Sequence, residues 1–229
     1  AVALSMSMGG PAFALFCATH VSEPWKAAHL EGFVSLSGSF GGALSPLLTL
    51  IRGQWSDLLP GPAQPFVRAM AMTLGSLPWI LPDAQVFGAD WVIAETPTRT
   101  FRIADTGDLL RAAGGPVAAA RWERFRGLAG RAPNVTTLCL YGVSRGRTPR
   151  RLRFPSEDLR STWPFAYPPQ IDRGDGDGTV LMPSLEVCGG WGRVQRMRVE
   201  TVTWPNVSHT DLLQLPGAYA ELTRFLARP

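Results

Sequence analysis

The sequence lacks any apolar run of the roughly 18 residues that a bilayer-spanning helix needs. The nearest stretch, Ala69–Pro82, is short and is interrupted by Pro78. The chain has 229 residues, of which 45% are hydrophobic and 17% charged. That length and balance are typical of a globular protein with one sizeable core.

Lysine is almost absent, because Lys26 is the only lysine among 22 basic residues. The net charge of +4 is a weak sign of a nucleic-acid partner, and we expect none. The densest basic stretch, "SRGRTPRRLRF", has no interleaved aromatic residues of the kind that stack on single-stranded bases. We predict a solvated loop there, with an anionic lipid surface as the functional alternative. Its arginines are Arg145, Arg147, Arg150, Arg151 and Arg153.

Cysteine is scarce, and Cys17, Cys139 and Cys188 form neither a CxxC pair nor a zinc-binding pattern. Their number fits one disulfide and one buried thiol, with the pairing left open. Two sequons begin at Asn134 and Asn206 and would be glycosylated only in the secretory pathway. Together these features favour an oxidising compartment.

Short apolar strands alternate with helical stretches along much of the chain, which indicates an α/β sheet with mostly parallel strands. The expected strands are Ala1–Ser5, Gly32–Gly38, Thr136–Val143 and Met197–Trp204. The expected helices are Met8–Thr19, a helix within 178–191, and Asp211–Arg228.

The alternation stops in a Pro-, Gly- and Trp-rich region of 43–131, which is too long for an ordinary crossover. We predict that this region is an inserted cap. The core domain would then comprise residues 1–42 and residues 132–229, which contain the motifs described next.

The stretch "LSMSMGG" places a serine where a strand turns into a helix. A serine exposed on such a sharp turn needs small residues two positions before and after it. Ser7 has Ser5 and Gly9 there, whereas Ser5 has Ser7 instead of glycine on its far side. A helix that begins at Met8 would direct a backbone N–H and its positive dipole end toward a developing oxyanion.

An acid and a histidine follow the serine in the order typical of α/β-hydrolases. Asp175 and Asp177 lie in the glycine-rich turn "DRGDGDGTV", which lacks the spacing and closing glutamate of an EF-hand. His209 follows the last expected strand, while His20 and His29 come too early in the chain. A serine nucleophile needs such a base, and the base needs a carboxylate to orient it.

With these motifs in place, the chain resembles the lecithin:cholesterol acyltransferase and lysosomal phospholipase A family of α/β-hydrolases. The resemblance covers nearly all of the sequence. It rests on the stretches "SMGGPAFALF", "PWKAAHLEGFVSLSGSFGG", "SLPWILP", "AETPTRTF", "CLYGV", "GDGDGTV", "LEVCGGW" and the "SH" before the final helix.

The resemblance implies a Ser7–Asp177–His209 triad, because the family's acid directly precedes the "GTV" motif. It also implies that the Met8 N–H is an oxyanion donor, and that no metal or organic cofactor is required. Family members carry further strands, a second oxyanion donor and a membrane-binding segment before the elbow. The resemblance therefore implies a longer protein, whose N-terminal strands this sequence lacks.

The resemblance also implies a Cys139–Cys188 disulfide, which leaves Cys17 free.

Two positions depart from the family pattern. Met6 stands where a histidine usually precedes the nucleophile, and Phe40 replaces the tryptophan of a "PWGG" motif.

The family's activity is removal of a fatty acyl group from a glycerophospholipid, at a membrane or lipoprotein surface. Water or an alcohol such as a sterol, diacylglycerol or ceramide then accepts the acyl group. Trp79 in "GSLPWILP" and Phe40 are the side chains expected to contact the substrate. The expected location is the lysosome, the vacuole or the extracellular space. The alternative is a non-catalytic lipid-binding or interaction protein derived from the same family.

Overall fold

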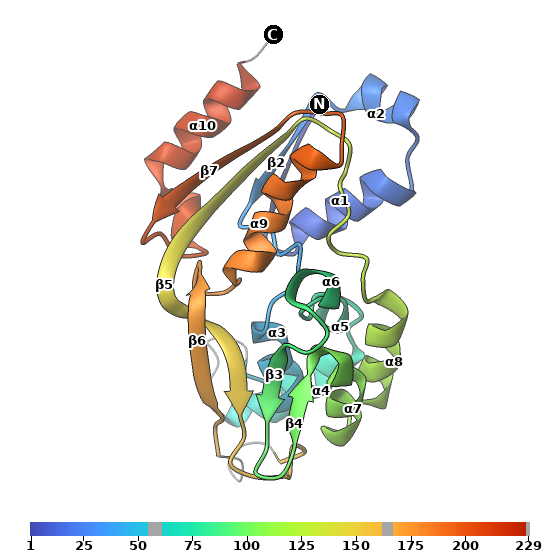
Figure 1. Cartoon of the computed structure of the whole chain (residues 1–229), viewed down its shortest axis with the longest axis vertical. Coiled ribbons are helices and arrows are strands. Elements are labelled where there is room, and N and C mark those ends of the chain that lie inside the picture. The colour runs from blue at the N-terminus through green and yellow to red at the C-terminus, as the bar shows by residue number, and fades with distance from the viewer. Residues whose placement is uncertain (55–60, 162–166, 228–229) are drawn as a thin grey trace. The chain divides into compact units, whose positions relative to one another are not determined.

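The computed structural model describes residues 1–54, 61–161 and 167–227, which separate into two compact units (Figure 1). The first unit comprises residues 1–41, 128–148 and 174 onward. The second comprises residues 42–127 and 149–173. Its longer segment nearly coincides with the region 43–131, whereas its second segment, 149–173, belongs to the stretch that the sequence analysis assigns to the core.

The first unit is built on four parallel strands in the order β1-β2-β5-β7. Ser5 pairs with Ser35 across the first two strands, and Phe33 with Thr137 across the next two. The strands are β1 (Val2–Met6), β2 (Gly32–Leu36), β5 (Thr137–Arg153) and β7 (Val199–Pro205). Strands β5 and β6 (Gln170–Gly176) pair with each other and run through both units.

Helices cover both faces of the central strands β2 and β5, whose residues are mainly apolar on both sides, as in most buried parallel strands. Phe33 and Cys139 face a cluster that includes Ala14 and Trp191, while Val34 faces another cluster. That second cluster contains Leu138, Leu140, Leu212, Ala218 and Phe225. The helices are α1 (Gly9–Thr19), α2 (Glu23–His29), α9 (Met182–Gly190), η3 (Trp191–Arg193), η4 (Asp211–Gln214) and α10 (Pro216–Leu226). The predicted α/β-hydrolase fold class, a mostly parallel sheet with flanking helices, is confirmed.

The expected single helix over Asp211–Arg228 is wrong, because the structure divides it into η4 and α10. Leu215 between them is extended, with ψ of 117°. Pro216 explains the break, since proline disfavours a helical conformation in the residue before it and has no N–H to continue a helix. Proline is well suited to the first helical position, where α10 begins.

The second unit is mainly helical around its own apolar core, which includes Leu47, Ile51, Leu109 and Trp122. Its strands β3 and β4 form an antiparallel hairpin, and β3 runs parallel to the end of β5. Its elements are α3 (Ser45–Arg52), η1 (Gly61–Ala63), α4 (Gln64–Thr73), α5 (Ser76–Trp79), α6 (Ala84–Phe87), β3 (Val92–Glu95), β4 (Thr100–Arg102), η2 (Ile103–Asp105), α7 (Thr106–Ala112) and α8 (Pro116–Phe125).

The arginine-rich stretch is strand, so its prediction as a loop is wrong. Its last residues alternate in burial: Leu152 and Phe154 are buried, while Arg153 between them is exposed. That alternation is the period-two pattern of a strand with one covered face. The arginine content obscured it.

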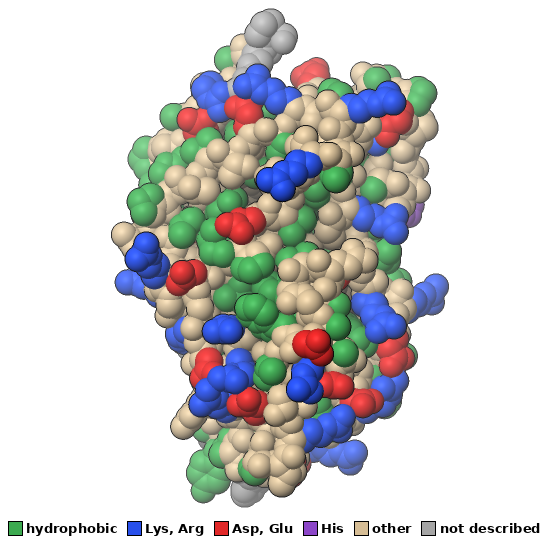
Figure 2. Space-filling view, in the orientation of Figure 1, with side chains coloured by type: hydrophobic (Ala, Val, Ile, Leu, Met, Phe, Trp, Pro, Cys, Tyr) green, Lys and Arg blue, Asp and Glu red, His purple; other side chains and the backbone are tan. Residues whose placement is uncertain are grey.

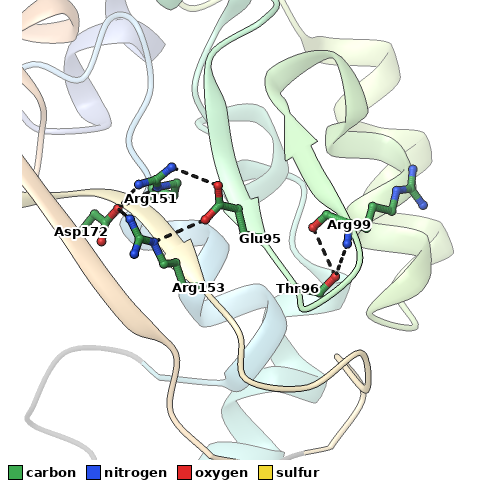
Figure 3. A network of polar contacts seen from close by, with 6 residues as sticks. All are labelled: Glu95, Thr96, Arg99, Arg151, Arg153 and Asp172. Atoms are coloured by element: carbon green, nitrogen blue, oxygen red, sulfur yellow. Dashed lines mark hydrogen bonds and ion pairs between the residues drawn. The ribbon is translucent and has the colours of Figure 1, made fainter.

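Two of these arginines bind carboxylates of their own unit (Figure 3). Arg151 Nε lies 2.7 Å from Asp172 Oδ2, and Arg151 Nη1 lies 3.0 Å from Glu95 Oε1. Arg153 reaches the same two carboxylates. The hydrogen bond from Arg151 lowers the pKa of Asp172. A lowered carboxyl pKa means that the network stabilises the fold at neutral pH, and that this stabilisation is lost on acidification through that pKa.

Charges of both signs are interspersed over the face shown in Figure 2, without a continuous basic surface. Among the described helices, none is both long and apolar enough to cross a membrane.

One disulfide joins Cys139 of β5 to Cys188 of α9, which is the pairing that the family resemblance implied. It lies in the core cluster that fills one face of the first unit's sheet. Cys17 is a free, buried thiol, and desolvation raises its pKa to about 11. A thiol with so high a pKa is protonated at neutral pH and unreactive.

We expect the Cys139→Ser/Cys188→Ser double variant to lose about 2–4 kcal/mol of unfolding free energy, because the bridge closes a long loop in the unfolded chain. Urea denaturation with and without dithiothreitol measures this loss. The reductant should lower the midpoint of the wild type and of a Cys17→Ala control equally, and leave the double variant unchanged. Non-reducing peptide mapping that placed Cys17 in a bridge would contradict the assignment.

Candidate functional site

Ser7 occupies a sharp turn between β1 and α1. Its φ is +53°, a left-handed conformation that is rare for a residue other than glycine. Hydrogen bonds on both sides hold it there: Ser7 N–H donates to Leu36 O (2.9 Å), and Ser7 O accepts from Gly10 N–H (3.0 Å). A serine strained at the end of a parallel strand and directly before a helix has the geometry of a nucleophile elbow.

The residue after Ser7 supplies a free backbone donor. Met8 is 37% exposed, and no described residue accepts a hydrogen bond from its N–H. It directly precedes the first turn of α1, where the helix dipole adds positive potential. A negatively charged oxygen beside Ser7 would therefore find a donor already in place.

Asp177 and His209 form a buried pair. The side-chain atoms Asp177 Oδ2 and His209 Nδ1 lie 2.7 Å apart. The backbone N–H of His209 also donates to the backbone carbonyl oxygen of Asp177, at 2.7 Å. Asp177 Oδ1 accepts the backbone N–H groups of Thr179 (3.0 Å) and Val180 (2.8 Å). Asp177 is fully buried and His209 is 8% exposed. A carboxylate can only accept at this contact, so a neutral ring hydrogen-bonded to it carries its proton on Nδ1 and leaves the Nε2 lone pair free.

The neighbouring Asp175 has a different environment. It is exposed on β6, and its Oδ1 accepts the N–H of Gly146 at 2.9 Å. The structure thus brings His209 together with Asp177, whereas Asp175 of β6 contacts the neighbouring strand β5.

Ser7 is placed in the same unit as the pair but is not hydrogen-bonded to it. Within the described residues, neither Ser7 Oγ nor His209 Nε2 makes a hydrogen bond. Hydrogen bonds between a nucleophile and its base are often long in unliganded structures and shorten when substrate binds. The three side chains together could support acyl transfer through a serine ester.

The loop after β2 connects the elbow with α9, which follows the Asp177 turn. Ser39 N–H donates to Ser7 O at 3.4 Å, and Gly41 N–H donates to Ser184 Oγ at 2.9 Å. Ser184 is fully buried in the first turn of α9. Sequence reasoning missed Ser184, because a serine inside a helix carries no signal of a tertiary hydrogen bond.

The two predicted substrate contacts lie in different settings. Phe40 is 1% exposed in the core of the first unit, with its ring centroid 4.5 Å from that of Trp191. Because Phe40 is buried, its observed role is packing in the core. Contact between Phe40 and a substrate stays a prediction. Trp79 lines a cavity of the second unit with a volume of about 350 Å³.

The two sequons differ in accessibility. Asn206 is exposed in a turn after β7. Asn134 is half-buried, its Nδ2 donates to Glu23 Oε2 at 2.7 Å, and its Oδ1 accepts Arg196 N–H at 3.2 Å. Asn206 is therefore the better placed for glycosylation, which stays a prediction at both positions.

The glycine before Asp177 has no room for a side chain. A Cβ on Gly176 would lie 2.2 Å from Val180 O and 2.5 Å from Thr148 Oγ1. We expect Gly176→Ala to lower the unfolding free energy and to displace the Asp177 carboxylate from His209. Thermal unfolding and the histidine NMR signals measure both effects.

The matched control for this prediction is Gly190→Ala. Gly190 lies at the end of α9, and its added Cβ would meet nothing within 4 Å. Equal behaviour of the two variants would refute the close packing proposed for the turn.

Comparison with known proteins confirms the family resemblance. The family model described as "Lecithin:cholesterol acyltransferase" matches residues 1–106. The chain is 29% identical to the mouse "Lysosomal phospholipase A and acyltransferase", a match covering 100% of this chain and 53% of that protein. It is 27% identical to the human "Phosphatidylcholine-sterol acyltransferase", over 83% of this chain and 42% of that protein. The chain thus spans about half the length of the curated relatives it matches.

The fold is also similar to that of a solved structure. A chain in "The crystal structure of Tle4-Tli4 complex" superposes with a TM-score of 0.54 at 13% identity, covering 91% of this chain and 53% of that one. This likeness concerns the fold alone.

Proposed function

We propose that the protein transfers a fatty acyl group from a glycerophospholipid through an acyl-serine intermediate on Ser7. One observation carries this proposal: a serine in strained left-handed backbone and a buried Asp177–His209 pair occur in one compact unit. Strain and buried charge are both costly, and natural folds keep them mainly at functional sites. The names of the relatives supply the lipid substrate class.

In the proposed first step, His209 Nε2 takes the hydroxyl proton while Ser7 Oγ attacks the ester carbonyl carbon. The carbonyl oxygen becomes an oxyanion that accepts the Met8 N–H. Collapse of this intermediate breaks the bond to the glycerol oxygen, which receives the proton from His209. Asp177 stabilises the imidazolium and fixes its orientation throughout.

The second step releases the acyl group to water or to an alcohol. His209 removes a proton from the acceptor, the acceptor attacks the acyl-serine carbonyl, and Ser7 Oγ recovers its proton. The relatives' names include both phospholipase and sterol acyltransferase, so we propose that water and lipid alcohols such as sterols, diacylglycerol or ceramide are acceptors. The disulfide supports action in the oxidising secretory pathway. The lipid substrates in the relatives' names support action at a membrane or lipoprotein surface.

A non-catalytic lipid-binding protein is the second candidate. The observation that favours it is Ser7 Oγ, which makes no hydrogen bond to His209 in the described structure. The two candidates differ in whether the serine is nucleophilic, so a probe that reacts only with activated serines distinguishes them.

We expect a fluorophosphonate probe to label Ser7, as peptide mass spectrometry would show. Ser7→Ala should abolish labelling and phospholipid turnover, and His209→Ala should lower both by about a thousandfold or more, since the three residues act as a unit. Asp177→Asn should also lose activity, because the ring then has the wrong tautomer.

Two changes serve as matched controls: Asp175→Asn on β6, two residues before Asp177, and His29→Ala on α2. Both should keep wild-type labelling. A wild-type protein that folds but is never labelled would favour the lipid-binding candidate.

We further propose that the second unit accommodates the acyl chain and that Trp79 forms part of its apolar wall. Trp79→Ala should then reduce turnover of long-chain esters more than that of short-chain esters. The comparison uses kcat/KM for p-nitrophenyl esters of increasing chain length. Trp91→Ala in the same unit, outside the cavity lining, is the control. Equal losses on all chain lengths would assign Trp79 to packing alone.

A further inference from the structure

A threonine of β5 reaches the turn that carries Asp177. Thr148 lies in the first unit and is fully buried, although it belongs to the arginine-rich stretch, whose residues 145–147 just before it are exposed. Its Oγ1 accepts the backbone N–H of Gly178 at 2.8 Å. The proposed acyl-transfer steps give this side chain no role, yet its hydroxyl contacts the residue next to the acid.

The N–H that Thr148 accepts belongs to the peptide unit between Asp177 and Gly178. At the other end of that peptide unit, the carbonyl oxygen of Asp177 accepts the backbone N–H of His209 at 2.7 Å. A trans peptide unit is planar and rigid, and its N–H and C=O point in opposite directions. Thr148 and the backbone of His209 therefore hold one rigid group from two sides.

The orientation of this peptide unit affects the Asp177 side chain, which begins at the same Cα atom. Asp177 Oδ1 is bonded within its own turn, and Asp177 Oδ2 lies 2.7 Å from His209 Nδ1. Gly178 has a φ of +96°, a conformation available to glycine because glycine is flexible. A flexible residue does little to fix the peptide unit before it. The hydroxyl of Thr148 supplies an acceptor from a neighbouring strand, which the Cys139–Cys188 bridge joins to α9.

We propose that Thr148 is a positioning residue, which orients the Asp177 carboxylate toward His209 through the Asp177–Gly178 peptide unit. It contacts neither the substrate nor the reacting atoms. The role needs a hydroxyl oxygen as acceptor, so serine can replace threonine, whereas valine and alanine cannot. The inference rests on the proposed function for its effect on turnover. Its effect on the contact between Asp177 and His209 requires no reaction.

Thr148→Val tests the hydroxyl, because it replaces Oγ1 with a methyl group. We expect kcat for phospholipid turnover and the rate of fluorophosphonate labelling to fall about tenfold to a hundredfold, since small displacements in a catalytic site are costly. KM should stay unchanged. The downfield proton NMR signal of His209 Nδ1–H, which reports the hydrogen bond to Asp177, should move upfield. Thr148→Ser should retain the wild-type rates and signal.

Thr137→Val is the matched control. Thr137 lies at the start of the same strand and is fully buried, and its Oγ1 donates to Val135 O at 2.7 Å. Both valine variants remove one hydrogen bond of a buried hydroxyl, so urea denaturation should show similar losses of stability. Equal effects of the two variants on labelling, or an unchanged His209 signal in Thr148→Val, would overturn the proposal.

Alanine at the same two positions repeats the comparison if Thr148→Val does not fold. Alanine removes the acceptor without placing a methyl group near Gly176, whose Cβ, if present, would lie 2.5 Å from Thr148 Oγ1. If Thr148→Ser loses labelling as Thr148→Val does, Thr148 has a packing role and the proposal is wrong.

The two proposals can fail separately. A folded wild-type protein that is never labelled would contradict the proposed function, while the His209 signal would still test Thr148. A labelled wild type, together with a Thr148→Val variant that behaves like Thr137→Val, would overturn the positioning role and leave the proposed function intact.

Discussion

The buried carboxylate of Asp177 is the constraint on which the first unit's site depends. A fully buried charge is tolerated only when its hydrogen-bonding capacity is satisfied. Here the turn itself supplies two backbone donors and His209 supplies a third. The glycine-rich sequence is what permits this wrapping, since Gly176 leaves no space for a side chain beside Val180. The same turn therefore satisfies the charge and positions the imidazole.

The strained residue Ser7 is held in a different way from Asp177. Regular secondary structure on both sides of the elbow keeps it in place. The β1–β2 ladder fixes the residues before it, and α1 fixes those after it. The backbone contact between Ser39 and Ser7, and the hydrogen bond from Gly41 to Ser184, connect this elbow to α9. The Cys139–Cys188 bridge joins α9 to the central strand β5. Elbow and acid turn are thus held by one set of tertiary contacts.

The sequence predicted the parts of this site that depend on local pattern. Small residues around Ser7 indicated the turn, and strand–helix alternation indicated the parallel sheet. The choice of Asp177 over Asp175 came from the family motif alone, because both residues lie in the same kind of turn. The structure assigns them different partners through tertiary contacts, which no local pattern encodes. The helix break before Pro216 could have been predicted from the sequence, whereas the tertiary hydrogen bond of Ser184 could not.

The arginines show why composition alone could not identify a binding surface. Arg151 and Arg153 lie in the densest basic stretch, yet both bind Glu95 and Asp172 of the same unit. Those carboxylates come from distant positions in the chain, so the sequence could not reveal the compensation. Whether an arginine is available to bind a ligand therefore depends on its ion-pair partners in the fold, and only the folded chain shows those partners.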